Sequence, residues 1–206
     1  VVAGNPFSYS TDFESSDPGA SEIGDGWTTF VNVFDAGGTF AYGYGAFPTP
    51  NGTGFIAAIA GGEGDPVEQG LQYLNFFSDY NNADHANSFA INPAAFQQRT
   101  IVAGSGGLYR FTFDAKAPAT GGIAPPTTAQ AFIKTLDPLS GFATTSEITV
   151  DLSAVDNTVW QTYQIELLID DSLLDGQLLQ FGFDNTATDY NPSGIFYDNI
   201  SFGLAP

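Results

Sequence analysis

Alternation of apolar and polar residues with a period of two constrains the fold of this chain more than any other feature of its sequence. Aromatic residues occupy every second position across 108–114, and large apolar residues do so across 162–169. Shorter runs at 148–152, 179–183 and 196–202 repeat this pattern. Because successive side chains of a β-strand point to opposite faces, each run predicts a strand with one buried face and one exposed face.

The segments between these runs are rich in the residues that form turns. Strand-like runs separated by clusters of Gly, Pro, Asn and Asp are typical of a β-sandwich, and no long amphipathic helical pattern competes with this interpretation. We therefore predict an all-β fold of two antiparallel sheets, formed by a single domain that covers residues 1–206. Two short helical turns are predicted in addition, at 94–98 directly after Pro93 and at 170–175. The turn-rich segments are 35–38, 48–52, 61–66, 121–126 and 184–194.

The composition agrees with a globular sandwich of this size. A chain of 206 residues is long enough to bury a substantial core in one domain. Its 19 Phe, 9 Tyr and 2 Trp residues supply bulk for the interior, which argues against disorder despite 24 Gly and 12 Pro. The chain has no Cys, so disulfides and thiolate metal sites are excluded.

The charge of the chain excludes several kinds of partner. Lys and Arg number 4 against 23 Asp and Glu, which gives a formal net charge of −19 at pH 7. Such a protein repels nucleic acid and anionic membranes, and no stretch reaches the roughly 18 apolar residues needed to cross a bilayer. The acidic residues either form a solvated surface suited to salty surroundings or include oxygen ligands of a cation, and both can hold at once. The basic residues are Arg99, Arg110, Lys116 and Lys134.

Short motifs at the two ends of the chain indicate a family. Asp-Phe-Glu at 12–14 and Gly-Trp at 26–27 stand near the start, and Val-Trp-Gln-Thr-Tyr at 159–163 precedes an Ile-rich strand. The segment 194–202, which contains Tyr-Asp-Asn-Ile, closes the chain. In these motifs the sequence resembles the calcium-containing β-jelly-roll carbohydrate-binding modules of families 4, 9 and 22. The resemblance covers most of the chain and implies a jelly roll in which the first and last strands are neighbours.

The resemblance also implies a structural calcium ion between the terminal strands. The ligands that it implies are Glu14 and Asp198, with Asp12 and Asp35 as further candidates. Calcium takes about six to eight oxygen ligands, so carboxylates from two adjacent strands would join the first strand to the last. Asp198 alternates with apolar residues, and on that face an unpaired carboxylate would be costly without a cation. The alternative is that Glu14 is an exposed strand-end residue and that Asp198 accepts hydrogen bonds from backbone amides.

Aromatic residues beside amides are the candidates for binding a ligand. Sugar rings present apolar faces that stack on Tyr or Trp, while their hydroxyls need donors and acceptors such as Asn. The alternative for each candidate is a place in the core, which holds most aromatic residues of a sandwich. Trp27 and Trp160 match framework positions of the family and are expected to be structural. The candidate ligand-binding residues are Tyr42, Tyr44, Tyr80, Asn82, Asn185 and Tyr190.

These features predict a protein that binds polysaccharide without catalysis. Uronate polymers are usually held by several Arg and Lys residues, so a neutral glycan is favoured unless calcium bridges acidic groups of the glycan. No cluster of paired carboxylates, Ser-His-Asp set or H-E-x-x-H motif is recognisable, and His85 is the only histidine. Two alternatives stay open: a jelly-roll polysaccharide-degrading enzyme, either glycosidase or lyase, and a calcium-stabilised adhesive or structural domain of a cell-surface protein.

The surroundings of the protein can also be inferred. The chain starts at Val1 rather than Met, which suggests a processed or excised domain. The lack of Cys and Met, together with the acidic balance, favours a secreted or cell-surface protein of bacterial origin. We expect polysaccharide as its partner, no nucleic acid, no insertion into a membrane, and attachment to a larger protein.

Overall fold

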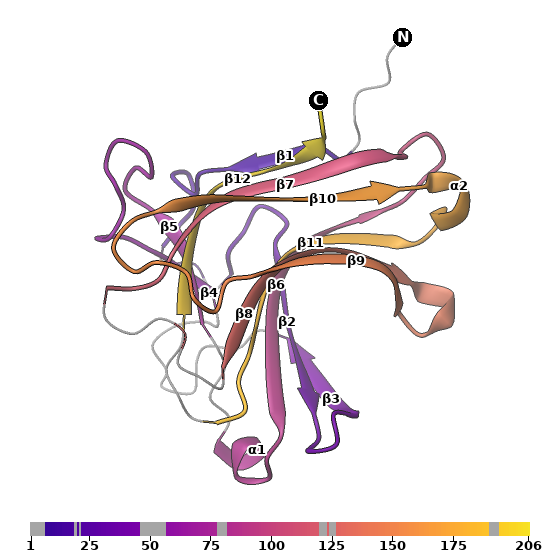
Figure 1. Cartoon of the computed structure of the whole chain (residues 1–206), viewed down its shortest axis with the longest axis horizontal. Helices are drawn as coiled ribbons and strands as arrows, with labels where there is room; N and C mark the ends of the chain where they lie inside the picture. Colours follow the sequence, from indigo (N-terminus) through magenta and orange to yellow (C-terminus); the bar gives the residue numbers. More distant parts are fainter. Residues whose placement is uncertain are drawn as a thin grey trace.

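The described residues fold into two six-stranded antiparallel β-sheets that pack face to face (Figure 1). The structure is a computed structural model, which describes residues 7–18, 20, 22–45, 57–77, 82–119, 123, 127–189 and 194–206. The predicted all-β sandwich, a jelly roll of two antiparallel sheets, is confirmed. None of the helices in the described ranges is long and apolar enough to cross a membrane.

The strands and helices follow one another along the chain in an order dominated by strands. The helices are short, with five residues in α1 and four in α2. The elements are β1 (Tyr9–Thr11), β2 (Thr28–Phe34), β3 (Phe40–Gly45), β4 (Ala57–Ala60), β5 (Tyr73–Phe77), α1 (Asn82–Ala86), β6 (Ala90–Thr100), β7 (Gly107–Lys116), β8 (Thr128–Asp137), a 3₁₀ turn (Pro138–Ser140), β9 (Ala143–Asp151), β10 (Gln161–Ile169), α2 (Asp171–Leu174), β11 (Leu178–Thr186) and β12 (Gly194–Leu204).

The order of the strands brings the two ends of the described chain together. Sheet A has the order β10-β7-β12-β5-β4, with β1 beside β12, and sheet B has the order β3-β2-β6-β11-β8-β9. Strand β12 pairs with β7 along one side, and on its other side it pairs first with β5 and then with β1. Within β1, Tyr9 pairs with Phe202 and Thr11 with Ile200. The prediction that the first and last strands are neighbours is therefore confirmed.

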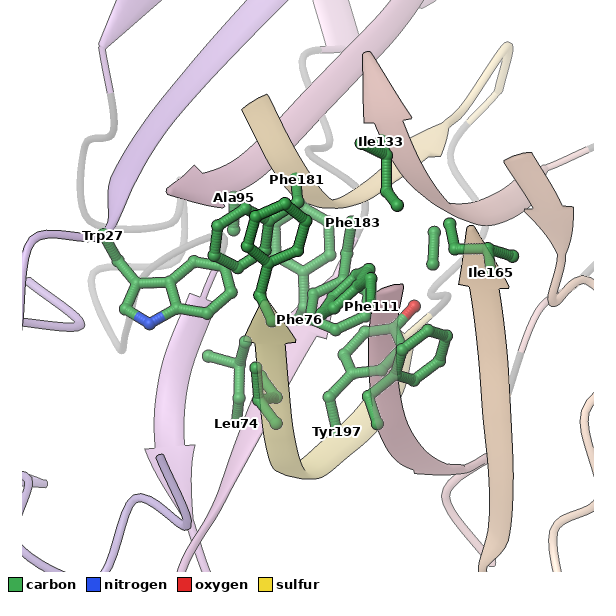
Figure 2. Close-up of a cluster of buried hydrophobic side chains, with 14 of the residues drawn as sticks. Trp27, Leu74, Phe76, Ala95, Phe111, Ile133, Ile165, Phe181, Phe183 and Tyr197 are labelled. Atoms are coloured by element: carbon green, nitrogen blue, oxygen red, sulfur yellow. The ribbon is translucent and has the colours of Figure 1, made fainter. Parts of the chain in front are cut away.

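The core lies between the sheets and consists mainly of aromatic rings (Figure 2). Phe183 of β11 stacks on Tyr197 of β12 with 3.6 Å between the ring centroids, and Phe181 stacks on Phe202 at 3.9 Å. Because β11 belongs to sheet B and β12 to sheet A, the two stacks join the sheets across the core. Aromatic pairs of this kind contribute about 0.5–1.5 kcal/mol each beyond the burial of their apolar area.

Strand β7 and helix α2 confirm two predictions made from the sequence. The aromatic residues of 108–114 are fully buried, while the residues between them point away from the core. The turn predicted at 170–175 is present as α2, because Asp170 caps it and accepts a hydrogen bond of 3.0 Å from the backbone N–H of Ser172.

The helical turn predicted at 94–98 is wrong, because these residues lie within β6, between β2 and β11. Pro93 lacks a backbone N–H and is rare inside a central strand. Here the regular pairing of β6 with β11 ends at Ala94 and continues only as an isolated bridge between Ile91 and Ala187. Pro93 thus lies where this ladder is interrupted, so its missing N–H disturbs no regular pairing with β11.

Gly182 allows β6 and β11 to approach closely at the centre of sheet B. A Cβ atom at this position would collide with the carbonyl oxygen of Ala95 and would lie 2.7 Å from the Cα atom of Phe96. We expect Gly182→Ala to lower the free energy of unfolding by about 1–3 kcal/mol, the usual cost of overpacking. Denaturant unfolding measures this cost. Gly45→Ala is the matched control, since a Cβ atom at Gly45 of β3 meets nothing within 4 Å; equal stability of the two variants would contradict the close approach.

Candidate functional site

A groove crosses the outer face of sheet B, the face turned away from the core. Val31 and Val33 of β2 are buried in the core, so Phe30, Asn32 and Phe34 point to the opposite face. The groove has a volume of about 770 Å³, within the range of ligand sites in proteins. It is lined from all six strands of the sheet, and from the turn that follows β8.

The first end of the groove is aromatic and is formed by β2 and β3. Phe34 and Phe40 meet edge to face with 6.2 Å between their centroids, and Phe40 is 56% exposed. The ring of Phe30 covers Gly43, where a Cβ atom would lie 2.7 Å from the ring. Glycine on the edge strand β3 therefore makes room for an aromatic surface. Asn32 is the polar side chain among these rings.

The middle of the groove is polar. Gln180 of β11 donates a hydrogen bond of 2.8 Å from Nε2 to Oε1 of Gln98 on β6, and both side chains line the groove. Lys134 of β8 pairs with Gln180 in register, and its Nζ lies 4.2 Å from the ring centroid of Phe132. This cation–π contact holds the ammonium group over the sheet. Among the described residues that line the groove, Lys134 is the one with a charged side chain.

The far end of the groove is again apolar. Leu178 and Leu136 pair with each other across β11 and β8, and Thr144 of β9 lies opposite Leu136. Phe142 follows the 3₁₀ turn after β8 and is 59% exposed. Exposed rings therefore lie at both ends, with amides and one ammonium group between them.

Asp184 lies beside the groove and holds three strands together. It pairs in register with the groove residue Ala94, and only 7% of it is exposed. Its carboxylate accepts hydrogen bonds of 3.1 Å from Nδ2 of Asn92 on β6 and from Nε2 of Gln130 on β8. Burial raises the pKa of this carboxyl. The bonds tie β6, β11 and β8 together, so Asp184 supports the sheet beneath the groove.

A second candidate site lies on β12, where its partner strand changes from β5 to β1. A bulge shifts the register between Asp198, which pairs with Asp114, and Ser201, which pairs with Thr112. Tyr197 and Ile200 point into the core, whereas Asp198 is on the outer face of sheet A with Asp114. The prediction that Asp198 shares a face with the apolar residues after it is therefore wrong, because the bulge changes the phase of the alternation.

Asp198 is nevertheless fully buried, because the segment before β5 covers it. Asn199 donates from Nδ2 to the carbonyl oxygen of Glu68 at 2.8 Å, and Gln69 donates from Nε2 to Asp114 at 3.0 Å. One oxygen of Asp198 accepts the backbone N–H of Asn199 at 2.8 Å, as the alternative to calcium predicted. Its Oδ2 and the Oε1 of Gln69 are buried without a hydrogen-bond partner among the described residues. Each of these two buried oxygen atoms could therefore accept a hydrogen bond or bind a cation.

Burial, together with the negative charges of Asp114, Asp12 and Glu14, raises the pKa of Asp198 to about 8. Asp12 accepts the backbone N–H of Glu14 at 3.2 Å and lines a hollow of about 370 Å³ between β1 and β12. Glu14 accepts the backbone N–H groups of two residues, 71 and 72, at 2.7 Å each. Within the described ranges, no three side chains of the types His, Cys, Asp and Glu are grouped closely enough to hold a metal ion.

The four predicted calcium ligands, all of them described residues, include no three that lie closely enough together to hold a metal ion. Asp12, Glu14 and Asp198 lie close enough for the charges of the first two to act on the third. Asp35 lies elsewhere, in the turn between β2 and β3 of sheet B, where it accepts the backbone N–H groups of Gly37 and Thr39 at 2.9 Å each. Its role is that of a turn residue.

Three of the predicted sugar-binding residues, Tyr42, Tyr44 and Asn185, lie away from the groove. Tyr42 and Tyr44 pair with Val33 and Val31, so they point to the core side of sheet B. Their rings stack with 6.1 Å between the centroids, and the hydroxyl of Tyr42 donates to Asp84. Asn185 is fully buried between the sheets, where its Nδ2 donates to the carbonyl oxygen of Phe76 at 3.4 Å, so it cannot reach a glycan.

The remaining three candidates cannot be placed. Tyr80 and Tyr190 lie outside the described residues, and Asn82 is described only as the first residue of α1, without its side chain. The two tryptophans have structural surroundings, as predicted. Trp27 is buried and donates from Nε1 to the hydroxyl of Tyr9 at 2.8 Å, and Trp160 donates from Nε1 to the carbonyl oxygen of Glu63 at 3.0 Å.

The residues that line the groove are not among those predicted from the sequence. Phe30 and Phe34 alternate with Val31 and Val33, so that both faces of β2 are apolar. This pattern of two apolar faces in a strand is the signal that could have revealed an apolar outer surface.

Two antiparallel sheets, with a groove on the outer face of one of them, define a jelly-roll β-sandwich of the kind that the terminal motifs predicted. No family model and no curated protein sequence matches the chain. Among solved structures, the chain is similar to the Stig cyclase Fisc from Fischerella sp. TAU in complex with (3Z)-3-(1-methyl-2-pyrrolidinylidene)-3H-indole. That likeness has 14% identity and a TM-score of 0.55, and it covers 97% of this chain and 98% of that chain.

Carbohydrate-binding modules are also among the similar structures. The CBM22-2 xylan-binding domain from Paenibacillus barcinonensis Xyn10C has 12% identity and a TM-score of 0.47, over 96% of this chain and 99% of that one. The enzymatically active domain of tailspike protein 4 from bacteriophage CBA120 has 17% identity and a TM-score of 0.49, over 88% of this chain, which spans only 20% of the tailspike chain. At these identities the likeness establishes the fold alone.

Proposed function

We propose that the protein binds polysaccharide in the groove of sheet B and does not cleave it. The observation that carries the proposal is the groove itself, in which exposed phenyl rings and amide side chains line one continuous hollow. Rings stack on the apolar faces of sugars, and amides form hydrogen bonds with sugar hydroxyls. The motifs that the sequence shares with carbohydrate-binding modules support the same function.

The charged residues around the groove support the binding of a neutral glycan, and they support binding without hydrolysis. Glycoside hydrolysis needs two carboxyl groups about 5–10 Å apart on either side of the scissile bond. The described lining of the groove includes Lys134 but no carboxylate. A net charge of −19 also disfavours polyanions. We further propose that the protein is part of a secreted or cell-surface assembly.

Variants of the groove test this function. We expect Phe30→Ala to weaken glycan binding by about 1–3 kcal/mol, a value taken from the stacking of bases on aromatic rings, and the variant's melting temperature shows that it is folded at the temperature of the titration. Gln98→Ala should weaken binding as well, because Gln98 is one of the amides of the polar middle. Calorimetric titration with xylan, β-glucan and mannan oligosaccharides measures both effects.

Leu168→Ala provides the control for these variants, since Leu168 is 68% exposed on β10 of sheet A, away from the groove. If none of the glycans binds to the unmodified protein, the proposed function is wrong and an adhesive or structural role gains support. If reducing ends accumulate during incubation with a polysaccharide, the protein is an enzyme.

We also propose that calcium binds at the terminal strands. The residues fit this ion because Asp198 and Gln69 each present a buried oxygen atom without a hydrogen-bond partner among the described residues. The negative charges of Asp12 and Glu14 act on Asp198, and backbone carbonyls and water can supply further oxygen ligands. The ion would balance the repulsion between these carboxylates and would join β1 to β12.

A second candidate function is the binding of a small apolar molecule in the same groove. The observation that favours it is that phenylalanines supply the aromatic residues of the described lining, without Tyr or Trp. The solved Stig cyclase structure, which has the same fold, holds an indole-containing compound. A rise in melting temperature with indole, but not with oligosaccharides, would select this function over glycan binding.

A further inference from the structure

The polarity of the groove changes twice along its length. The first end is formed by Phe30, Phe34 and Phe40, and the middle contains the polar groups of Gln98, Gln180 and Lys134, beside Phe96 of β6. Beyond the middle, Leu136, Leu178 and Phe142 make the far end apolar again. Six strands at about 4.8 Å spacing span about 24 Å, so the two apolar ends are several sugar rings apart.

An unsubstituted sugar can lay its apolar face on these rings, but its hydroxyl groups find few partners at the two ends. Each sugar ring carries hydroxyl groups, and a hydroxyl that loses water without finding a partner costs about 1–3 kcal/mol. Phenylalanine and leucine offer no donor or acceptor, whereas Tyr and Trp would provide one. At the first end Asn32 is the one polar side chain of the described lining, and at the far end it is Thr144. The ends are therefore suited to ligand groups that have lost their hydroxyls.

Acyl esters of sugars have this property. Esterification replaces a hydroxyl with a carbonyl, which only accepts hydrogen bonds, and an apolar methyl or larger group. The amide N–H groups of Gln98 and Asn32 and the ammonium group of Lys134 can donate to ester carbonyls, while the rings of Phe40 and Phe142 cover the apolar part. An ester adds no negative charge, so it is compatible with the net charge of −19.

We infer that the groove selects a neutral glycan that carries acyl ester groups, with the apolar part of the esters on the two aromatic ends and the sugar chain across the polar middle. This inference rests on the proposed function of glycan binding. It makes the exposed rings of Phe40 and Phe142 determinants of specificity.

Chemical removal of the esters tests this specificity. We expect acetylated xylo-, manno- or gluco-oligosaccharides of about six sugars to bind more tightly than the same samples after alkaline saponification. The expected difference is about fourfold for each methyl group buried, or about tenfold for two partly buried groups. Acetylating the saponified samples again should restore the affinity, which shows that the alkali did not act in another way. Calorimetric titration with short oligosaccharides avoids aggregation of the polymers.

Variants at the two ends connect this preference to the groove. Phe40→Ala and Phe142→Ala should each reduce the ratio of the two affinities by about threefold or more, and Phe40→Leu should keep most of it. Leu173→Ala should leave the ratio unchanged, because Leu173 is 76% exposed on α2, outside the groove. All these side chains are largely exposed, so the variants should fold, and melting temperatures verify this.

The outcomes separate the two proposals. Equal affinity for acetylated and saponified samples, or tighter binding of the saponified ones, would overturn the inference and leave the proposed function intact. Binding of neither form in any of the three series would overturn the proposed function and the inference with it. An unchanged preference in both Phe40→Ala and Phe142→Ala would also overturn the inference, since the esters would then be bound elsewhere.

Discussion

Without calcium, the protein is expected to lose stability as the pH rises from 5 to 8, and calcium is expected to restore that stability. Asp198 has a pKa of about 8 in the folded chain against an ordinary value of 3.8, mainly because it is buried. The folded state therefore holds a proton that the unfolded state has released. The stability that this proton contributes is fully present below the ordinary pKa. It falls by about 1.4 kcal/mol for each pH unit between 5 and 7. Calcium should reverse this trend, because it binds the ionised form.

The variant Asp198→Asn distinguishes the effect of the Asp198 carboxyl from that of the other acidic residues. Its side chain has nearly the same shape and no proton to lose, so the pH dependence between 5 and 8 should largely disappear. At pH 8 and without calcium, the variant should be more stable than the unmodified protein. It should also fail to respond to calcium, which at a hundredfold excess over its Kd would stabilise the unmodified protein by about 2.7 kcal/mol.

Thermal unfolding in EDTA and in calcium, at several pH values, measures both effects. Asp35→Asn is the matched control, since Asp35 was a predicted ligand that the structure places in the turn between β2 and β3. This variant should respond to calcium like the unmodified protein. If EDTA leaves the melting temperature unchanged and Asp198→Asn keeps the pH dependence, calcium does not bind at Asp198.

The sequence allowed the strands and the sandwich to be predicted, because burial on one face leaves a period of two that can be read without knowing the partners of a strand. Strand β7 shows this, since its buried aromatic residues alternate regularly from Tyr109 to Phe113. The same argument failed at β6, where Pro93 suggested a helix. Whether the pairing between two strands is interrupted at a given residue depends on the whole sheet. The local sequence does not reveal it.

The sequence could not show which face of its sheet each site residue lies on, because two irregularities change the alternation of the strands. The bulge after Asp198 places this residue opposite to the side that the sequence indicated. In β3 the register shifts beside Phe34, so that Tyr42 points to the core side and Phe40 to the groove. One inserted residue reverses every assignment that follows it along a strand.

The choice of residue type was the other source of error. The sequence pattern favours sugar binding at tyrosines and neighbouring amides, since these combine an apolar surface with polar groups. The groove instead combines phenylalanines with Gln98 and Gln180, which come from different strands. Only the register of β6 with β11 places the two amides side by side, and the spacing of residues along one strand cannot show this.

Removal of the Glu63 carboxylate is expected to destabilise the fold by about 3 kcal/mol. Lys116 is only 8% exposed, and its Nζ lies 3.1 Å from Oε2 of Glu63. The described ion pairs give Lys116 no second carboxylate. Glu63→Ala would leave the ammonium group buried without a directly paired carboxylate, with Asp156 as a more distant negative charge, and breaking comparable pairs costs about 3–5 kcal/mol. Because the side chain of Glu63 is 31% exposed, water weakens the pair, and the lower part of this range applies.

A second variant decides whether the buried charge causes this loss. The carboxylate of Glu63 also accepts the backbone N–H of Ala119 at 2.9 Å, so Glu63→Ala removes a hydrogen bond as well as the counter-charge. Lys116→Met keeps the apolar stem and removes the charge, so adding it to Glu63→Ala should recover most of the lost stability. Urea unfolding of the two single variants and the double variant measures the coupling. A double variant as unstable as Glu63→Ala would show instead that Glu63 acts by anchoring the backbone at Ala119.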